Sequence, residues 1–514
     1  NAKIFQQDGF SPLYDEGWNF ETIRKENLFL QKVGNCEMDE SLRERFKAEV
    51  RAMRAWTYLG MTMTFGKVPL ITEVLDYNSP NIPRDEVSVI RDFIMKELTE
   101  AAAILPEKYA GGYPNEKGRI TKYACLLLKA RAALYFGDYA LAESTAKEVM
   151  DKGGFSLFKI SSLSDAQKKE AEEMSLYIDF AEKGIDKDEF VKGMFNYEAL
   201  WHTENANPDN PEYIMTRQYA ASSWDYQDMT RYTSMRPNQL GGWSSVTPTQ
   251  NLVDAYWGVD GHSVPQLPTP EERAKAYNQI KADLDAYQKP EGEAKFIAFC
   301  QEKIKNGTLK DYKYIQEFRN RDSRMYVSIL MPFKSWYESN YGDKFVYEWI
   351  KNGNNESKTG FNFRKMLSLE NDANGDGQAT GDYPCIRYAE ILLIYAEAHT
   401  QTTGYDAATE AALNQLRDRC GMPDVPSGLS KEEGLKLIQN ERRIELAGEG
   451  FRGDDMTRYS DDYWKEHMNN VPIMTPDGDT ELTMKWSSRM RLKPIPQTAI
   501  DLNPLLAGDQ NPGY

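Results

Sequence analysis

Two neighbouring helical stretches separated by a glycine turn place the tightest constraint on the fold of this chain. They form the segment TKYACLLLKARAALYFGDYALAESTAKEVMDKGG, residues 121–154, which breaks at Gly137. Apolar residues recur at helical spacing on both sides of the break. The small residues Ala130, Ala142 and Ala146 would let the two helices pack closely. The pattern predicts an antiparallel pair, which is either a tetratricopeptide-type hairpin or an ordinary helix pair.

Similar helical segments lie toward both ends of the chain. Near the N-terminus, helices are predicted over residues 41–65 and 85–105, and the second is bounded by prolines on both sides. Toward the C-terminus, helices are predicted over 385–401, 407–423 and 430–447, the last with Ser430 as N-cap and Glu433 three residues later. We therefore expect a mainly α scaffold that the chain leaves and re-enters.

The middle of the chain has a different texture, rich in Pro, Gly, Asn and aromatic residues. Six of the 10 tryptophans lie between residues 201 and 349. Long irregular segments are usually functional loops or disorder, and disordered segments are poor in aromatic residues. We therefore predict an ordered, loop-rich lobe within a single unit, with these boundaries: unit 1–514, N-terminal helical part 41–200, aromatic lobe 201–384 and C-terminal helical part 385–514.

Charge and composition exclude several classes of function. The net charge is -17, with 62 basic against 79 acidic residues, which disfavours nucleic acid as a partner. A neutral ligand fits such a surface best. The five cysteines include no C-x-x-C, and the four histidines form no H-E-x-x-H, so neither a disulfide framework nor a zinc hydrolase is indicated. The chain begins on a polar residue without a signal peptide, and we expect a processed or trimmed N-terminus.

The segment ERRIELAGEGFRGDDMTRY, residues 441–459, carries two patterns with chemical meaning. Residues 448–453 read G-x-G-x-x-G, but a dinucleotide fingerprint follows a strand and opens a helix, whereas these glycines end one. Glu441, Glu445 and Glu449 share one helical face, which suggests acid–base chemistry, a metal site or a structural ion network. Because arginines are interleaved with them, we predict a structural ion network and no catalytic residue.

The same segment resembles the C-terminal signature of the SusD-like (RagB/SusD) family, ERR-x-E-L-x-x-E-G-x-R-x-x-D-x-x-R. Other stretches resemble further family segments in the same order along the chain: EVRAMRAWTYLGMTMTFGKVPLI (49–71), TPTQNLVDAYWGVDG (247–261), NRDSRMYVSIL (320–330), YPCIRYAEILLIYAEA (383–398), LNQLRDRCGMP (413–423) and LKPIPQTAIDLNPLLAGDQNPGY (492–514). The family's stretch with its lipid-bearing cysteine is absent or cut short in this chain.

The resemblance implies a mainly α SusD-like fold, with tetratricopeptide-type helix pairs and an irregular loop-rich lobe. It also implies a surface-exposed lipoprotein of the outer membrane, attached only through an N-terminal lipid anchor that this chain lacks. Such a protein binds an oligosaccharide or polysaccharide, delivers it to a SusC-like TonB-dependent transporter, is not an enzyme and requires no cofactor. Two alternatives stay open. One is a related peptide-binding module, and the other is a glycoside hydrolase, which needs two carboxylates across a sugar cleft.

Sugars stack on aromatic rings, and polar neighbours hydrogen-bond their hydroxyls. We expect the ligand to be bound by residues in loops, namely Tyr77, Asn78, Trp224, Tyr226, Trp243, Trp336 and Tyr337. For each of these residues the alternative is ordinary packing. Trp56, Trp201 and Trp257 lie in apolar or helical context and are predicted to be core, and Trp349 is left open.

The segment NDANGDGQATGDY, residues 371–383, begins like a calcium-binding loop. The candidate ligands of a structural calcium ion are Asp372, Asn374, Asp376 and Gln378. The twelfth position is Tyr383 where such loops carry Glu, and the alternative is a solvated polar turn.

Overall fold

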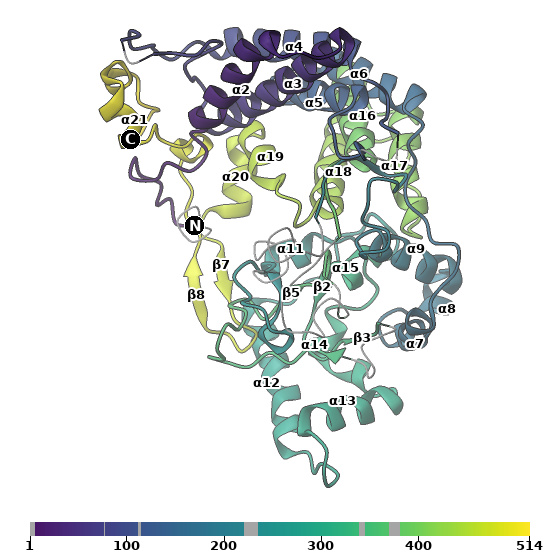
Figure 1. Ribbon diagram of the computed structural model, residues 1–514. Coiled ribbons are helices and arrows are strands. Elements are labelled where there is room, and N and C mark those ends of the chain that lie inside the picture. The colour runs from purple at the N-terminus through teal and green to yellow at the C-terminus, as the bar shows by residue number, and fades with distance from the viewer. Residues whose placement is uncertain are drawn as a thin grey trace.

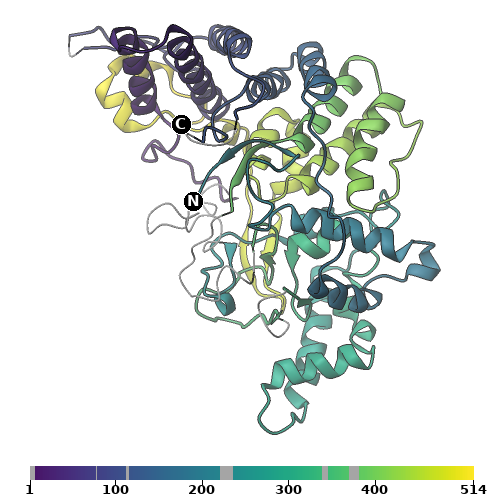
Figure 2. The same cartoon turned by 45° about the vertical axis from the view of Figure 1, so that its right-hand side comes forward.

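The computed structural model describes residues 6–76, 78–110, 115–219, 235–338, 345–367, 369 and 381–514. The chain is mainly helical. Helices from both ends of the sequence gather in the upper half of the molecule, and the middle of the sequence forms the lower half (Figure 1). A second view, turned by 45°, shows the same division (Figure 2).

The upper half holds two groups of helices that are far apart in sequence. The N-terminal group is α2 (Phe20–Lys32), α3 (Glu40–Phe65), α4 (Val87–Ile104), α5 (Lys122–Tyr135) and α6 (Tyr139–Lys152). The C-terminal group is α16 (Tyr388–Thr402), α17 (Ala407–Arg419), α18 (Lys431–Glu445), α19 (Arg452–Arg458), α20 (Asp461–Met468) and α21 (Gln497–Leu502). Neighbours α3 to α6 pack in order, and α16 packs against α6, so the two groups form one scaffold.

The pair α5 and α6 is the helix hairpin expected from the sequence. Gly137 lies between them with φ +77°, a left-handed conformation that glycine adopts without a steric penalty. Asp138 caps α6 by accepting a hydrogen bond from the Leu141 amide. Ala130, Ala142 and Ala146 are fully buried, which explains how the two helices approach closely.

The lower half takes in residues 165–199 of the predicted helical part 41–200, and the predicted loop-rich lobe 201–384 contains more helix than the sequence led us to expect. Its helices are α7 (Asp165–Glu173), α8 (Phe180–Lys183), α9 (Lys187–Ala199), α11 (Gln250–Ala255), α12 (Pro270–Ala286), α13 (Lys295–Lys305), α14 (Lys313–Gln316) and α15 (Ser323–Ser328). Helix α12 has a clear local cause, because Thr269 and Glu272 form a capping box and Pro270 occupies the first turn. Short 3-10 turns occur at η1 (Val33–Asn35), η2 (Met174–Leu176), η3 (Asn238–Leu240), η4 (Leu309–Asp311), η6 (Ser488–Arg491) and η7 (Pro504–Asp509).

The described strands form antiparallel pairs. They are β1 (Tyr213–Arg217) with β6 (Tyr383–Arg387), β2 (Ile329–Leu330) with β5 (Asn362–Phe363), β3 (Ser335–Trp336) with β4 (Phe345–Val346), and β7 (Pro472–Met474) with β8 (Thr480–Thr483). Strand β6 corrects the prediction of a helix over 385–401. The helix begins only at Tyr388, because residues up to Arg387 pair with β1, where Tyr213 faces Arg387.

Two large hydrophobic cores correspond to the two halves. The first joins α3–α6 with α16–α18, and the second fills the lower half. Trp201 is buried, and Trp56 and Trp257 pack against the first core, as predicted. Trp349, left open by the sequence, is buried in the second core. Among the helices that the structure describes, none is long and apolar enough to cross a bilayer.

Candidate functional site

The glutamates of the 441–459 segment form a buried ion network, as predicted. Glu441 lies 2.6 Å from both Arg324 and Arg417. Glu445 pairs with Arg324, Arg387 and Arg419, and Glu449 pairs with Lys365 and Arg387, at 2.7 Å in both cases. The network ties the C-terminal end of α18 to the lower half and to strand β6.

Electrostatics explains why these carboxylates stay charged although they are buried. Burial opposes ionisation of Glu445, but the guanidinium groups of Arg419, Arg387 and Arg324 hold its pKa well below the usual range. All members of the Glu445 group have side chains exposed by 1% or less. A carboxylate held this way is neither a free base nor an open metal ligand. The segment therefore has a structural role: it holds neighbouring elements together.

The glycines that follow α18 end that helix. Gly448 and Gly450 have φ +78° and +91°, and α18 stops at Glu445 just before them. No strand precedes them in this part of the described chain, so the dinucleotide geometry is not formed here.

The residues predicted to bind ligand are placed in different surroundings. Tyr77, Trp224 and Tyr226 lie outside the described residues, as do the proposed calcium ligands Asp372, Asn374, Asp376 and Gln378. Asn78 is exposed, and Trp243 is 41% exposed. Both therefore stay candidates, as do the residues outside the described ranges.

Trp336 is a correction to the predicted set. Its side chain is only 1% exposed, because β3 pairs with β4 and turns the ring into the second core. There it lies edge-on to Phe345 at 6.4 Å and beneath the Arg364 guanidinium at 5.0 Å. No face of the ring is open to a ligand.

A shallow depression is lined by Asp76 and Ser79, on either side of the predicted ligand-binding residue Asn78. It has a volume of about 410 Å³. Its wall combines aromatic and aliphatic groups with amides and hydroxyls from three parts of the chain, among them Trp18, Phe20, Ser79, Asn81, Thr498 and Leu502. We call it the Trp18 depression. It lies near α21, at the end of the molecule where α2 is found (Figure 1).

Local hydrogen bonds shape the rim of the Trp18 depression. The Asp76 carboxylate accepts from the Asn78 amide at 2.8 Å, and the Asp76 amide donates to Ser79 Oγ at 3.0 Å, which forms a tight turn. Across the depression, Asn503 Nδ2 donates to the Ile82 carbonyl at 2.7 Å and joins the two sides. Asn81 and Thr498 are exposed, so their polar groups face solvent.

Trp18 lines this depression and is not among the residues predicted from the sequence to bind ligand. Its ring is half-buried, 5.2 Å from Phe20 and edge-on to Phe65 at 5.0 Å, so it is held firmly. A signal existed in the aromatic pair Trp18–Phe20 at the start of the first described helix, α2.

Tyr337 lines a second depression of about 360 Å³ whose chemistry is charged. Its hydroxyl donates to Glu173 at 2.6 Å, which fixes the ring. His202 lies in the same wall, with Nδ1 3.5 Å from Glu204. Burial opposes the charge of His202, but the carboxylates of Glu204, Glu198 and Glu338 raise its pKa to about 9. This depression presents a fixed cation among acids.

The chain is similar to known proteins in both sequence and structure. A sequence model of the SusD family matches residues 211–514. The SusD-like protein P38 of Formosa agariphila is 22% identical over 451 residues, which cover 85% of this chain and 70% of that protein. The crystal structure of a SusD-like protein from Bacteroides fragilis has a TM-score of 0.73 at 25% identity and covers 99% of this chain and 89% of its own. A SusD-like carbohydrate binding protein from the same species has a TM-score of 0.67 at 20% identity, covering 98% and 88%.

Proposed function

Because this chain belongs to the SusD family, we propose that it captures an oligosaccharide or polysaccharide at the cell surface and delivers it to a SusC-like TonB-dependent transporter. One similar fold belongs to a protein described as carbohydrate binding, which supports the ligand class. On this proposal the protein is an outer-membrane lipoprotein held by an N-terminal lipid anchor.

The Trp18 depression is the observation that carries the proposal. An aromatic ring offers a face to the C–H surface of a sugar, and nearby amides and hydroxyls pair with its hydroxyl groups. The depression supplies both, through Trp18 and through Asn81, Ser79 and Thr498. Its volume of about 410 Å³ is that of an ordinary small-ligand site.

Binding without hydrolysis suits this depression better than catalysis. A glycosidase needs two carboxyl groups about 5–10 Å apart across the sugar. Among the described residues that line the Trp18 depression, Asp76 is the single carboxylate, and two hydrogen bonds of the 76–79 turn already engage it. A second acid for the reaction is therefore lacking in this wall.

The test is affinity electrophoresis of the folded protein in gels that contain a panel of neutral polysaccharides. We expect retardation by at least one of them, and at least about tenfold weaker binding for Trp18→Ala, because aromatic platforms carry much of the contact energy. Asn81→Ala is the second variant, since an exposed amide can be removed without disturbing the core. Tyr14→Ala is the matched control: it is also an exposed N-terminal ring, 40% accessible, but lies outside the depression.

Two outcomes would overturn the proposal. Release of sugar from any polysaccharide would make the protein a hydrolase. Binding of peptides in place of every glycan tested would favour the peptide-binding alternative. If glycan binding survives both variants, the Trp18 depression is not the platform, and Trp243 becomes the next residue to test.

A further inference from the structure

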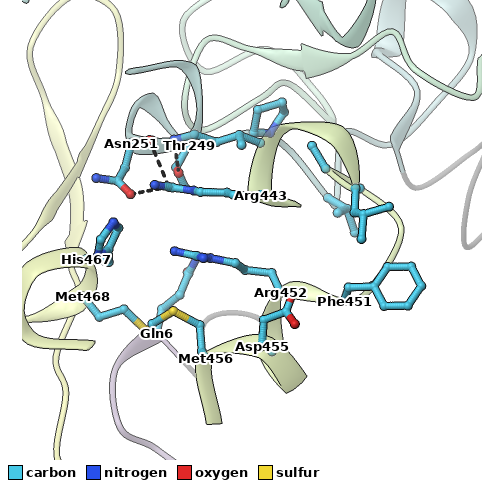
Figure 3. A pocket seen from close by; sticks show the side chains of 18 of the residues that line it. Gln6, Thr249, Asn251, Arg443, Phe451, Arg452, Asp455, Met456, His467 and Met468 are labelled. Carbon is cyan, nitrogen blue, oxygen red and sulfur yellow. Dashed lines mark hydrogen bonds between the residues drawn. The ribbon is translucent and has the colours of Figure 1, made fainter. Parts of the chain in front are cut away.

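A separate cavity of about 310 Å³ lies where the end of α18 meets α11, α19 and α20. Figure 3 shows two arginines, Arg443 and Arg452, extending side by side across it with their guanidinium groups toward His467. We call this cavity the Arg443 pocket. It is distinct from the Trp18 depression and shares no lining residue with it.

The Arg443 guanidinium has N–H groups that no described residue uses. Its Nη2 donates to the carbonyl and the side-chain oxygen of Asn251, at 3.0 and 2.5 Å (Figure 3). Both bonds use one nitrogen, so Nη1 and Nε have no partner among the described residues. No carboxylate of the described chain lies within ion-pair distance of Arg443, although it is largely withdrawn from solvent. Burial, and after it the Arg452 guanidinium, lower the pKa of Arg443 to about 9, which leaves it charged at neutral pH.

Arg452, like Arg443, lacks an ion-pair partner in the described chain. Its Nη1 donates to the Tyr463 hydroxyl at 2.8 Å, and its guanidinium carbon lies 5.1 Å from the centre of that ring. These contacts fix its direction without neutralising it, and it forms no ion pair with any residue that the structure describes. Two like charges side by side repel each other. An anion placed between them would relieve that repulsion.

The wall of the pocket does not supply this anion. Asp455 is the sole acid among its described lining residues. Both of its oxygens accept from Arg442 Nε at 2.8 Å, and Oδ1 also accepts from Arg458 at 3.1 Å. This carboxylate is therefore committed to other arginines. The chain as a whole has a net charge of -17. Two arginines without an ion-pair partner in the described chain therefore make this pocket locally positive.

His467 adds a requirement for a hydroxyl group. Its Nδ1 donates to the Tyr463 carbonyl at 2.8 Å, so the other ring nitrogen, Nε2, carries the lone pair in the neutral ring. Burial, followed by the charges of Arg443 and Arg452, lowers the pKa of His467 to about 4. The ring is thus a hydrogen-bond acceptor at neutral pH. A ligand that pairs with all three groups carries both a negative charge and an O–H group.

The remainder of the wall is largely apolar. Met456, Met468 and Met484 line it together with Leu446, Leu252 and Val246. Flexible methionine side chains adapt to irregular shapes. The cavity therefore has room for a compact, mainly uncharged body attached to the anionic group.

The geometry points to the Arg443 pocket as a binding site for a sugar acid, with the carboxylate held by Arg443 and Arg452 and a neighbouring hydroxyl donating to His467. A planar carboxylate matches the two-pronged donor geometry of a guanidinium group. A peptide carboxylate supplies the charge but no adjacent hydroxyl, which is why an acidic sugar is the better fit. The sugar part of this assignment rests on the proposed function, whereas the anion part rests on the pocket alone.

The probe is sodium glucuronate, measured by calorimetric titration and by the thermal unfolding of the whole chain. Glucose is the neutral counterpart, acetate supplies a carboxylate without a hydroxyl, and sulfate supplies a different anion. We expect saturable binding of glucuronate with a rise in Tm, weaker binding of acetate and none of glucose. Added salt lowers the affinity, because charge pairing dominates.

Arg452→Gln is the principal variant. It should weaken glucuronate binding at least about tenfold, since a hydrogen bond between charged groups is lost. Its fold should survive, because no described carboxylate loses a partner. Arg91→Gln is the matched control: it removes one positive charge from an exposed site next to Asp92 and should bind like the parent protein.

Each remaining outcome counts against the assignment. The anion site is wrong if glucuronate does not bind, or if Arg452→Gln binds it as well as the parent. Equal binding of sulfate or acetate removes the sugar-acid specificity. Retardation in neutral polysaccharide gels, measured on the same variant, reports on the Trp18 depression. If a variant loses glucuronate binding but keeps neutral-glycan binding, or the reverse, the result shows which of the two proposals has failed.

Discussion

Nη1 of Arg387 lies 2.9 Å from Oε1 of Glu445, and both side chains are almost completely withdrawn from solvent. Arg387 is the last residue of β6 and Glu445 is the last residue of α18. This one contact therefore fixes the strand that returns from the lower half against the helix that ends in the upper half. Nη1 of Arg387 also lies 2.7 Å from Glu212, in the segment leading into β1, which extends the tie to the partner strand.

Neutralising the centre of this network should be costly. Glu445→Gln leaves three buried arginines with one fewer carboxylate, and removal of one partner from a buried pair costs about 3–5 kcal/mol. Arg442→Ala, which strips Asp455 of its 2.8 Å partner, should act in the same direction. The measurement is the free energy of unfolding in urea. Glu21→Gln is the control, because its pair with Lys25 is exposed and should cost little. An unfolding curve like that of the parent, together with lost ligand binding, would show that this segment binds ligand and is not purely structural.

His202 should make the protein less stable in alkali. Its pKa is about 9 in the folded protein and about 6.5 in an unfolded chain. Between these values the folded state binds a proton that the unfolded state does not, so stability is fully present below pH 6.5 and falls as pH rises toward 9. The loss is on the order of 3 kcal/mol. Unfolding of His202→Asn, compared with the parent across this range, should show a flatter pH dependence; an unchanged slope would contradict the prediction.

His467 should have the opposite effect on the acid side. Burial, followed by the charges of Arg443 and Arg452, keeps its pKa near 4 in the folded protein. Below about pH 6.5 the unfolded chain takes up a proton that the folded chain refuses. Stability is therefore lost as pH falls from about 6.5 toward 4. His467→Gln should reduce the slope of the free energy of unfolding in this window while leaving the alkaline side as in the parent.

Gly193 on α9 should not tolerate a side chain. A Cβ there would lie 2.1 Å from the Cys420 carbonyl carbon and from the Gly421 nitrogen, which are backbone atoms that cannot turn away. Gly193→Ala should therefore destabilise the protein by at least about 1–3 kcal/mol. Gly60 on α3 is the control, because a Cβ at that position would meet no atom within 4 Å and alanine favours a helix. Gly60→Ala should stabilise the protein by about 0.5–1 kcal/mol, a result read from the same urea titration.

Trp336 should matter for stability rather than for direct ligand contact. Truncating a buried tryptophan costs about 3–5 kcal/mol, and this ring also packs under Arg364 at 5.0 Å. We expect Trp336→Ala to unfold at lower urea concentration, while the fraction that stays folded binds glycan with parent affinity. Trp243→Ala, at a ring that is 41% exposed, should leave the unfolding curve unchanged. A stable Trp336→Ala protein that no longer binds glycan would restore this ring to the binding site.

Local patterns in the sequence were reliable wherever a segment's structure depends on its own residues. The helix predicted over 41–65 is found at Glu40–Phe65. Ser430 and Glu433 form the expected capping box at the start of α18. The ion network expected for 441–449 is present, but the interleaved arginines are not the partners of these glutamates: Arg442 pairs with Asp455, and Arg443 forms no ion pair with the described chain. The partners themselves could not be named, because Arg324, Lys365 and Arg387 lie on other elements.

Local sequence patterns were therefore enough to predict the mainly helical class, the helix hairpin, a buried ion network and the family. These depend on short-range periodicity, on capping and on motifs that can be read in order. Tertiary structure alone decided that Trp336 is buried, that residues 385–387 form a strand, and that Trp18 meets Asn81 and Leu502 in one depression. It also brought Arg443 and Arg452 together without a carboxylate from the described chain. The physical reason is that burial and proximity arise from contacts between distant segments, which no local pattern encodes.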